Sequence, residues 1–202
     1  MTSLADALAA LSRGDVSWVS VAADGRVALA EAPAGLIIPG SFNPLHGGHT
    51  ELAARAERRF ARPAAYEISV LNVDKPELPH EEVIRRASQF AGRAPVVFTR
   101  SPRFTEKATL FPNCVFAVGA DTAARVVDPR YHGHDPATML AALTAIRDTG
   151  CRFFVAGRAN GEGVFVALGR LAIPASHADL FEGLNEEEFR VDVSSTELRN
   201  SV

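Results

Sequence analysis

Short apolar runs alternate with amphipathic segments through most of the chain, from residue 35 to about residue 156. The runs hold few polar positions, as expected for strands buried on both faces of a sheet; they cover residues 36–38, 66–73, 96–99, 115–118 and 152–156. Between several of them, apolar residues recur every three or four positions, which predicts helices; these lie over residues 48–60, 79–91 and 139–149.

The alternation of strand and helix is typical of a parallel sheet with helices on both faces. We therefore expect an α/β fold with a Rossmann-like, doubly wound parallel sheet. In such sheets, ligands bind beyond the carboxyl ends of the strands, where the strand order reverses. The strand ends are thus the place to look for chemistry.

The first 34 residues have a different pattern. A Ser3 cap precedes apolar residues at helical spacing and Gly14 follows as a stop; the apolar residues are Leu4, Ala7, Leu8 and Leu11. Two β-like runs, 16–22 and 26–31, then flank Asp24-Gly25, a dipeptide typical of hairpins. We expect a helix-plus-hairpin extension over 1–34 and a main domain over 35–202. The extension is too small to hold a core alone, so it should pack on the main domain or on a second copy of the chain.

Composition excludes several classes of protein. The 202 residues are 47% hydrophobic and 22% charged, which is ordinary for a globular domain and excludes disordered and fibrous chains. A net charge of −3 argues against binding of long nucleic acids. No apolar run approaches the roughly 20 residues of a membrane span, and the N-terminus lacks a signal-peptide pattern. We expect a cytoplasmic protein without a membrane partner, with Cys114 and Cys151 as buried free thiols.

Two strand ends have residues suited to phosphate. The first strand runs into residues 39–50, where glycines permit close backbone approach and a helix start favours an anion. His46 and His49 in this segment are placed to donate to phosphate oxygens. The fourth strand ends in Gly119 and Asp121 at the next predicted helix. If the two strands are neighbours where the order reverses, both motifs face one crevice.

A second anion site is predicted near the end of the chain. Ser194, Ser195 and Thr196 open a predicted helix, and Arg199 lies one turn later. Backbone N–H groups, hydroxyls and a guanidinium therefore converge there. Arg158, which follows the fifth strand, is a further candidate for the nucleotide site.

These residues resemble a known family. Gly40-Ser41-Phe42-Asn43-Pro44-x-His46-x-Gly48-His49 looks like the first signature of the nucleotidylyltransferase superfamily, His-x-Gly-His with its preceding loop. Ser194-Ser195-Thr196-x-x-Arg199 looks like the second signature, and Gly119-x-Asp121 falls where the family binds the nucleoside. The resemblance covers residues 35–202 in layout. Within the superfamily, Phe-Asn-Pro-x-His and Ser-Ser-Thr-x-x-Arg are most similar to nicotinamide or nicotinate mononucleotide adenylyltransferases.

The resemblance implies transfer of AMP from ATP to the 5′-phosphate of nicotinamide or nicotinate mononucleotide in NAD biosynthesis, by direct in-line attack. It assigns catalysis to His46, His49 and Arg199. It assigns nucleotide binding to residues of both signatures and of two strand ends: Gly40, Ser41, Phe42, Asn43, Gly48, Gly119, Asp121, Arg158, Ser194, Ser195 and Thr196. Lys75 and Asp121 are the expected acceptor contacts. Mg²⁺ is the expected cofactor, held mainly by nucleotide phosphates with no protein ligand set.

Other interpretations stay open. Nucleotidyl transfer from ATP or CTP to another phosphorylated acceptor fits the same motifs, and so does a non-catalytic nucleotide-binding module. A homo-oligomer is open as well, because an exposed hairpin edge can pair with a second copy. The segment 131–135, with two histidines and an acid, favours a surface loop over a metal site, and a mobile lid over the site is a further alternative. Arg100, Arg103 and Lys107 favour a solvated loop after the third strand, and the alternative is that this strand end presents a cation to the acceptor.

Overall fold

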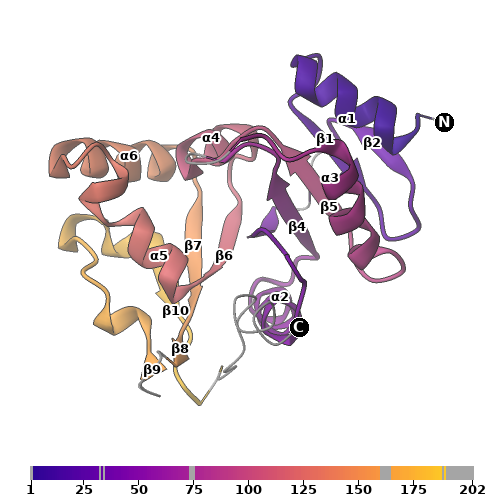
Figure 1. Ribbon diagram of the computed structural model, residues 1–202. Coiled ribbons are helices and arrows are strands. Elements are labelled where there is room, and N and C mark those ends of the chain that lie inside the picture. The colour runs from indigo at the N-terminus through magenta and orange to yellow at the C-terminus, as the bar shows by residue number, and fades with distance from the viewer. Residues whose placement is uncertain are drawn as a thin grey trace.

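The computed structural model describes residues 2–31, 33, 35–72, 76–159, 165–187 and 189. Its main sheet has eight strands in the order β10-β7-β6-β3-β4-β5-β1-β2 (Figure 1). Their bounds are β1 Trp18–Val21, β2 Val27–Leu29, β3 Leu36–Pro39, β4 Ala64–Ser69, β5 Val96–Thr99, β6 Val115–Gly119, β7 Arg152–Ala156 and β10 Phe181–Gly183. A separate two-stranded sheet pairs β8 (Arg158–Ala159) with β9 (Phe165–Val166).

The six strands from β10 to β5 in this order are parallel, as predicted. From β3 the chain winds outward through β4 and β5, and then returns to β6 and winds the other way through β7 and β10. The strand order therefore reverses between β3 and β6, which are hydrogen-bonded neighbours with Leu36 opposite Val115 and Ile37 opposite Phe116. The sequence analysis required the first and fourth predicted strands to be neighbours where the strand order reverses, and β3 and β6 meet this condition. The predicted α/β, Rossmann-like fold class is confirmed.

Helices cover both faces of the sheet. The buried apolar residues of α1 (Leu4–Arg13), α2 (Gly47–Phe60) and α3 (His80–Ala87) belong to one apolar cluster. Those of α4 (Phe104–Leu110), α5 (Ala120–Val126) and α6 (Pro136–Asp148) belong to a second cluster on the opposite face. Figure 1 shows α5 and α6 on the side of β7, while α1 and α3 lie at the other end beside β1 and β5. Short 3-10 turns follow at Ser88–Phe90, Pro129–Tyr131, Leu168–Arg170 and Ala175–Leu180.

The N-terminal segment is part of this sheet. The Ser3 hydroxyl caps α1 by accepting the Asp6 N–H at 3.1 Å, and Gly14 ends the helix with φ of 79°. The predicted hairpin is present as the antiparallel pair β1–β2. β1 then pairs antiparallel with β5, so that Val19 lies opposite Phe98. Residues 4–29 thus extend the sheet at one edge and share a core with α2 and α3.

The prediction of a solvated loop around Arg100, Arg103 and Lys107 is wrong for Lys107, which is helical and buried. Residues 104–110 form helix α4, and Lys107 on it is only 5% exposed. Its Nζ lies 2.6 and 2.7 Å from the two carboxylate oxygens of Glu67, a β4 residue that is 1% exposed. Arg100 is also paired, because its Nη1 lies 2.7 Å from Glu77 Oε1. A lysine can be buried here because a buried carboxylate neutralises it.

The bounds of one strand and one helix differ most from the prediction. The strand expected over 66–73 begins at Ala64 and ends at Ser69. The helix expected over 79–91 ends at Ala87 and continues as a 3-10 turn. The spacing of Val83, Ile84, Ala87 and Phe90 predicts that Ile84 lies on the buried side of this helix, but Ile84 is 41% exposed, whereas Arg86 is buried. The burial of Arg86 follows from its hydrogen bonds, described below.

The cysteine prediction is confirmed. Cys114 and Cys151 are free and buried, with their sulfur atoms 3.6 Å apart at the start of β6 and β7. Among the helices in the described ranges, none is both long and apolar enough to cross a bilayer.

Candidate functional site

The loop between β3 and α2 is built on a buried aromatic anchor. Phe42 is fully buried, and its ring meets the edges or faces of His49, Tyr66 and Phe90 at centroid distances of 4.8, 5.2 and 5.4 Å. Its φ of 43° is uncommon for a large side chain. A Cβ on Gly40 would lie 2.7 Å from the Phe42 ring, so the glycine makes room for this packing. Phe42 therefore anchors the loop in the hydrophobic core.

The histidines of the first motif cap helix α2. His46 is the N-cap residue, and its Nδ1 accepts the Gly48 N–H at 3.2 Å. The Nδ1 of His49 accepts the His46 N–H at 3.3 Å, which completes a capping box. The two rings stack with centroids 3.8 Å apart and planes 27° from parallel. Each imidazole thus uses one nitrogen to satisfy the first turn of the helix.

This capping fixes the tautomer of both rings. A nitrogen that accepts a hydrogen bond has no proton of its own, so each neutral ring has its proton on Nε2. Within the described ranges, neither Nε2 has a hydrogen-bond partner. The result is a pair of N–H donors at the start of α2, where the positive end of the helix dipole also favours an anion. Donors of this kind suit an anion such as phosphate.

Burial keeps these histidines neutral. Desolvation lowers the pKa of His46 below its ordinary value. Desolvation, together with the neighbouring His46, lowers the pKa of His49 to about 4. At neutral pH the pair therefore offers two polar N–H groups rather than two positive charges.

A charged pair lies at the carboxyl ends of β6 and β7, the two strands next to β3 on one side of the sheet. Asp121 is in the first turn of α5, directly after Gly119 at the end of β6. Arg158 follows β7, and its Nη1 lies 2.6 Å from Asp121 Oδ2. Their side chains are 40% (Arg158) and 63% (Asp121) exposed, so both groups remain accessible to a ligand. This pair was not predicted, although each residue was a candidate.

The structure brings part of the predicted site together. The loop residues Gly40, Ser41, Phe42 and Asn43, the capping residues His46, Gly48 and His49, and Gly119, Asp121 and Arg158 all follow the carboxyl ends of β3, β6 and β7. These strands are neighbours in the sheet, so their carboxyl ends share one edge. Lys75, Ser194, Ser195, Thr196 and Arg199 lie outside the described residues.

The sequence reasoning missed the side chains that hold this loop. Arg85, Arg86 and Gln89 of the α3 region bond to loop residues 41–45. One signal was present: Arg86 occupies the buried side of α3, three residues after Val83, where an apolar residue is the norm. A buried arginine needs a partner, and here the partners lie in the loop.

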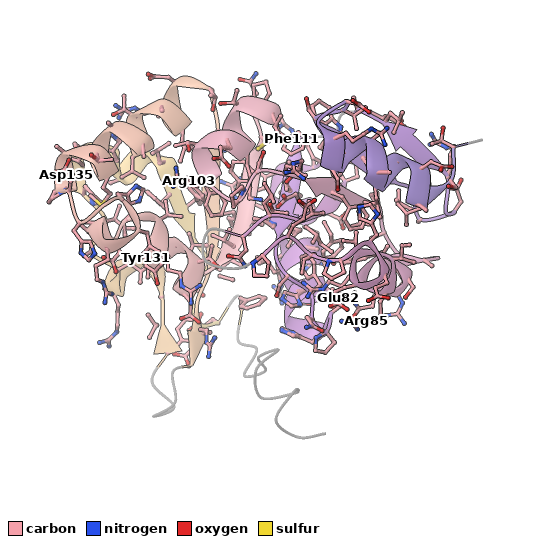
Figure 2. All side chains as sticks on the ribbon, turned by 45° about the horizontal axis from the view of Figure 1, so that its top comes forward. Glu82, Arg85, Arg103, Phe111, Tyr131 and Asp135 are labelled. Carbon is pink, nitrogen blue, oxygen red and sulfur yellow. The ribbon has the colours of Figure 1, made fainter. Side chains whose placement is uncertain are left out.

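The segment 131–135 is a surface loop that is hydrogen-bonded to the helices on either side of it. The His132 Nε2 lies 3.0 Å from the Val126 carbonyl oxygen, and the Asp135 carboxylate caps α6 by accepting N–H groups of Ala137 and Thr138. Figure 2 places Tyr131 and Asp135 at one end of the molecule, far from Glu82 and Arg85 on α3. In the described part of the chain, no group of three or more His, Cys, Asp or Glu residues is arranged to hold a metal ion.

Two hollows in the described part of the chain lie away from this site. Two hollows of about 200 and 220 Å³ flank the N-terminal hairpin, and their linings include Ser20 and Pro95 in one and Leu4 and Ile84 in the other. Neither lining contains a loop residue from 40 to 49, Asp121 or Arg158. The site is therefore identified by its donors and its place at the strand reversal.

Comparison with known families agrees with this geometry. The model of the cytidylyltransferase-like family matches residues 37–201, from the second residue of β3 onward. A search of curated proteins finds no match to the chain. The matched segment contains the loop, the histidine pair, Asp121 and Arg158, and it spans well over half of the 202 residues. The chain belongs to the cytidylyltransferase-like family of nucleotidyltransferases.

Proposed function

We propose that the protein is an adenylyltransferase that transfers AMP from ATP to the 5′-phosphate of nicotinamide or nicotinate mononucleotide. A phosphate oxygen of the mononucleotide attacks the α-phosphorus of ATP, the bond between the α-phosphorus and the bridging oxygen breaks, and pyrophosphate leaves. Such a reaction asks the protein mainly for positioning and for stabilisation of charge on phosphate oxygens.

The observation that supports this proposal most is the pair of Nε2–H donors on His46 and His49. They stand at a helix start, at the carboxyl end of β3 and beside β6, where the strand order reverses. Both are held by their Nδ1 atoms before any ligand arrives. Preorganised donors at the position where charge develops are the strongest common device for lowering such a barrier.

Each remaining residue has a role in the proposal. Arg158 contributes a positive charge to the phosphates, and Asp121 bonds the ribose or the acceptor. From the sequence motifs, Ser194, Ser195, Thr196 and Arg199 bind the β- and γ-phosphates, and Lys75 contacts the acceptor. Mg²⁺ enters with the triphosphate, bound mainly through phosphate oxygens, which is its usual mode in such sites.

The choice of ATP and a pyridine mononucleotide rests on the two motifs that resemble that group of enzymes, Phe42-Asn43-Pro44-x-His46 and Ser194-Ser195-Thr196-x-x-Arg199. The family name makes cytidylyl transfer the competing specificity. Both reactions use the same phosphate geometry, so they differ in base and acceptor recognition.

A panel of substrates separates these reactions. The protein is incubated with Mg²⁺ and ATP or CTP, each with nicotinamide mononucleotide, nicotinate mononucleotide or another phosphorylated acceptor, and pyrophosphate and the joined product are measured. We expect release with ATP and a pyridine mononucleotide. Faster release with CTP or with another acceptor would overturn the specificity, and nucleotide binding with no release in any mixture would indicate a non-catalytic module.

A further inference from the structure

Three residues of the loop after β3 are bonded to Arg86 and Gln89 in one helix region. Arg86 Nη1 donates to the Ser41 carbonyl at 2.9 Å, and Gln89 Nε2 donates to the Phe42 carbonyl at 2.9 Å. The Leu45 N–H donates to Gln89 Oε1 at 2.8 Å. One amide side chain therefore bonds on both sides of Asn43 and Pro44.

The two arginines of α3 are held in place by a shared acid. Glu82 accepts from Arg85 Nε at 2.6 Å and from Arg86 Nε at 2.7 Å, and Figure 2 shows Glu82 and Arg85 next to each other. Arg85 Nη2 also donates to Asn43 Oδ1 at 2.7 Å. These bonds lower the pKa of Glu82 to about 2, so the acid stays charged across the physiological range. Arg86 has only 10% of its side chain exposed, so its bond to the loop is shielded from water.

The helix is itself fixed by apolar packing. Val83 and Ala87 are buried in the same cluster as Leu8 and Leu11 of α1. The Ser12 hydroxyl at the end of α1 donates to Glu77 Oε1 at 2.9 Å, just before α3 begins. The N-terminal extension thus packs against the element that holds the loop.

We propose that α3 and the turn after it act as a positioning element for the catalytic loop, with Arg86 and Gln89 as positioning residues. Their bonds to Ser41, Phe42 and Leu45 set the course of the chain into His46, and hence the place of its Nε2–H. This inference rests on the proposed function for its effect on turnover. Its structural part, the restraint of residues 41–46, stands independently.

The loop needs such a restraint. Phe42 has a positive φ, which costs free energy for a residue other than glycine. Its carbonyl accepts a hydrogen bond from Gln89, and the carbonyl of Ser41 before it accepts one from Arg86. Catalysis by positioning is sensitive to small displacements, since a shift of about 1 Å can cost on the order of 10²-fold in rate.

Gln89→Met is the test variant, because methionine keeps the length of the side chain and removes both bonds. Arg86→Lys is the second variant and keeps the charge but not the planar donor pair. Glu81→Gln, an exposed change on the same helix, is the matched control. Three quantities are measured for each: amide hydrogen exchange of peptides covering 40–49, kcat and KM for triphosphate and acceptor, and the urea midpoint of unfolding.

We expect Gln89→Met to raise exchange in residues 41–46 by about 10-fold and to lower kcat by about 10- to 10²-fold. Exchange in 115–126 and the KM of the acceptor should stay at the wild-type value, and Glu81→Gln should match the wild type throughout. Unchanged exchange and unchanged kcat in both test variants would overturn the proposal. So would a fall in activity that only matches the fraction of unfolded protein.

The two proposals fail in different ways. If the wild-type protein transfers no nucleotide to any acceptor, the proposed function fails, while hydrogen exchange still decides whether α3 restrains the loop. If transfer is present and neither exchange nor kcat responds to Gln89→Met or Arg86→Lys, only the positioning role fails.

Discussion

The His46 ring stacks on the His49 ring at a centroid distance of 3.8 Å, and the two are linked by the His46 N–H bond to His49 Nδ1. Two tasks are therefore divided between the nitrogens of each ring. The Nδ1 atoms complete the helix cap, and the Nε2–H groups remain for a ligand. A substitution can therefore remove the Nε2–H group of a ring and keep the helix cap.

Stability should fall as the pH drops from about 6.5 to 4, because of this pair. The pKa of His49 is lowered to about 4 in the fold and is near 6.5 in the unfolded chain. Between these values the unfolded chain binds more protons, so acid favours unfolding, and the effect is absent above pH 6.5. Urea unfolding at pH 7 and pH 5 measures it.

The control for this effect is His49→Asn, which has no group that titrates in the window. The wild type should lose more unfolding free energy than His49→Asn between pH 7 and 5. Glu82 does not interfere, because its lowered pKa affects stability only below its ordinary value of 4.5. Equal losses in the two proteins would show that His49 is not buried as a neutral ring.

Arg158→Gln should raise the KM for the triphosphate by about 10- to 10²-fold, since a hydrogen bond to a charged group contributes about 1.5–3 kcal/mol. Its ion pair with Asp121 is exposed, so the free energy of unfolding should change by less than about 1 kcal/mol. Steady-state kinetics and urea unfolding provide both values. The matched control is Arg130→Gln, which breaks an exposed pair with Asp128 elsewhere on the surface. Equal KM values in the two variants would remove Arg158 from the nucleotide site.

Lys107→Met should destabilise the protein by about 3–5 kcal/mol, because it leaves the buried Glu67 carboxylate without its counter-charge. Thr99 Oγ1 still donates to Glu67 at 2.6 Å, but one neutral bond does not replace a charge. The double variant Glu67→Gln/Lys107→Met should recover part of the loss, since no buried charge remains. Urea unfolding of the single and double variants is the measurement. A double variant as unstable as the sum of the two single variants would show that the pair is not coupled.

The sequence was sufficient for the part of the site that depends on local pattern. The buried strand at 36–38, the glycine-rich segment after it and the amphipathic helix from Gly47 together place His46 and His49 at a strand-to-helix junction. The second strand end, Gly119 to Asp121, followed from the same rule of buried strand and helix start. The sequence did not predict that these two strands are neighbours, and the shared crevice was conditional on it. Pairing of strands about 80 residues apart leaves no local signal in the sequence.

The predictions that failed have one physical cause, which is ion pairing and hydrogen bonding between residues that are distant in the sequence. Lys107 looks solvated in its polar neighbourhood, and only Glu67, on another strand, makes its burial favourable. Arg86 is buried on α3, while Ile84 is exposed, because the partners of Arg86 are the Ser41 carbonyl and Glu82. Polar residues were assigned to the surface by default, and long-range pairing reversed that default in both places.

The central claim is that the Nε2–H groups of His46 and His49 act on the phosphates of the triphosphate. The direct test is turnover of His46→Asn and His49→Asn with saturating Mg²⁺, triphosphate and acceptor. Asparagine places an acceptor oxygen close to the position of Nδ1, so the cap is retained while Nε2 is lost. We predict a fall in kcat of about 10² to 10³-fold in each variant, with unfolding free energy within about 1 kcal/mol of the wild type. Wild-type turnover in either folded variant would contradict the account.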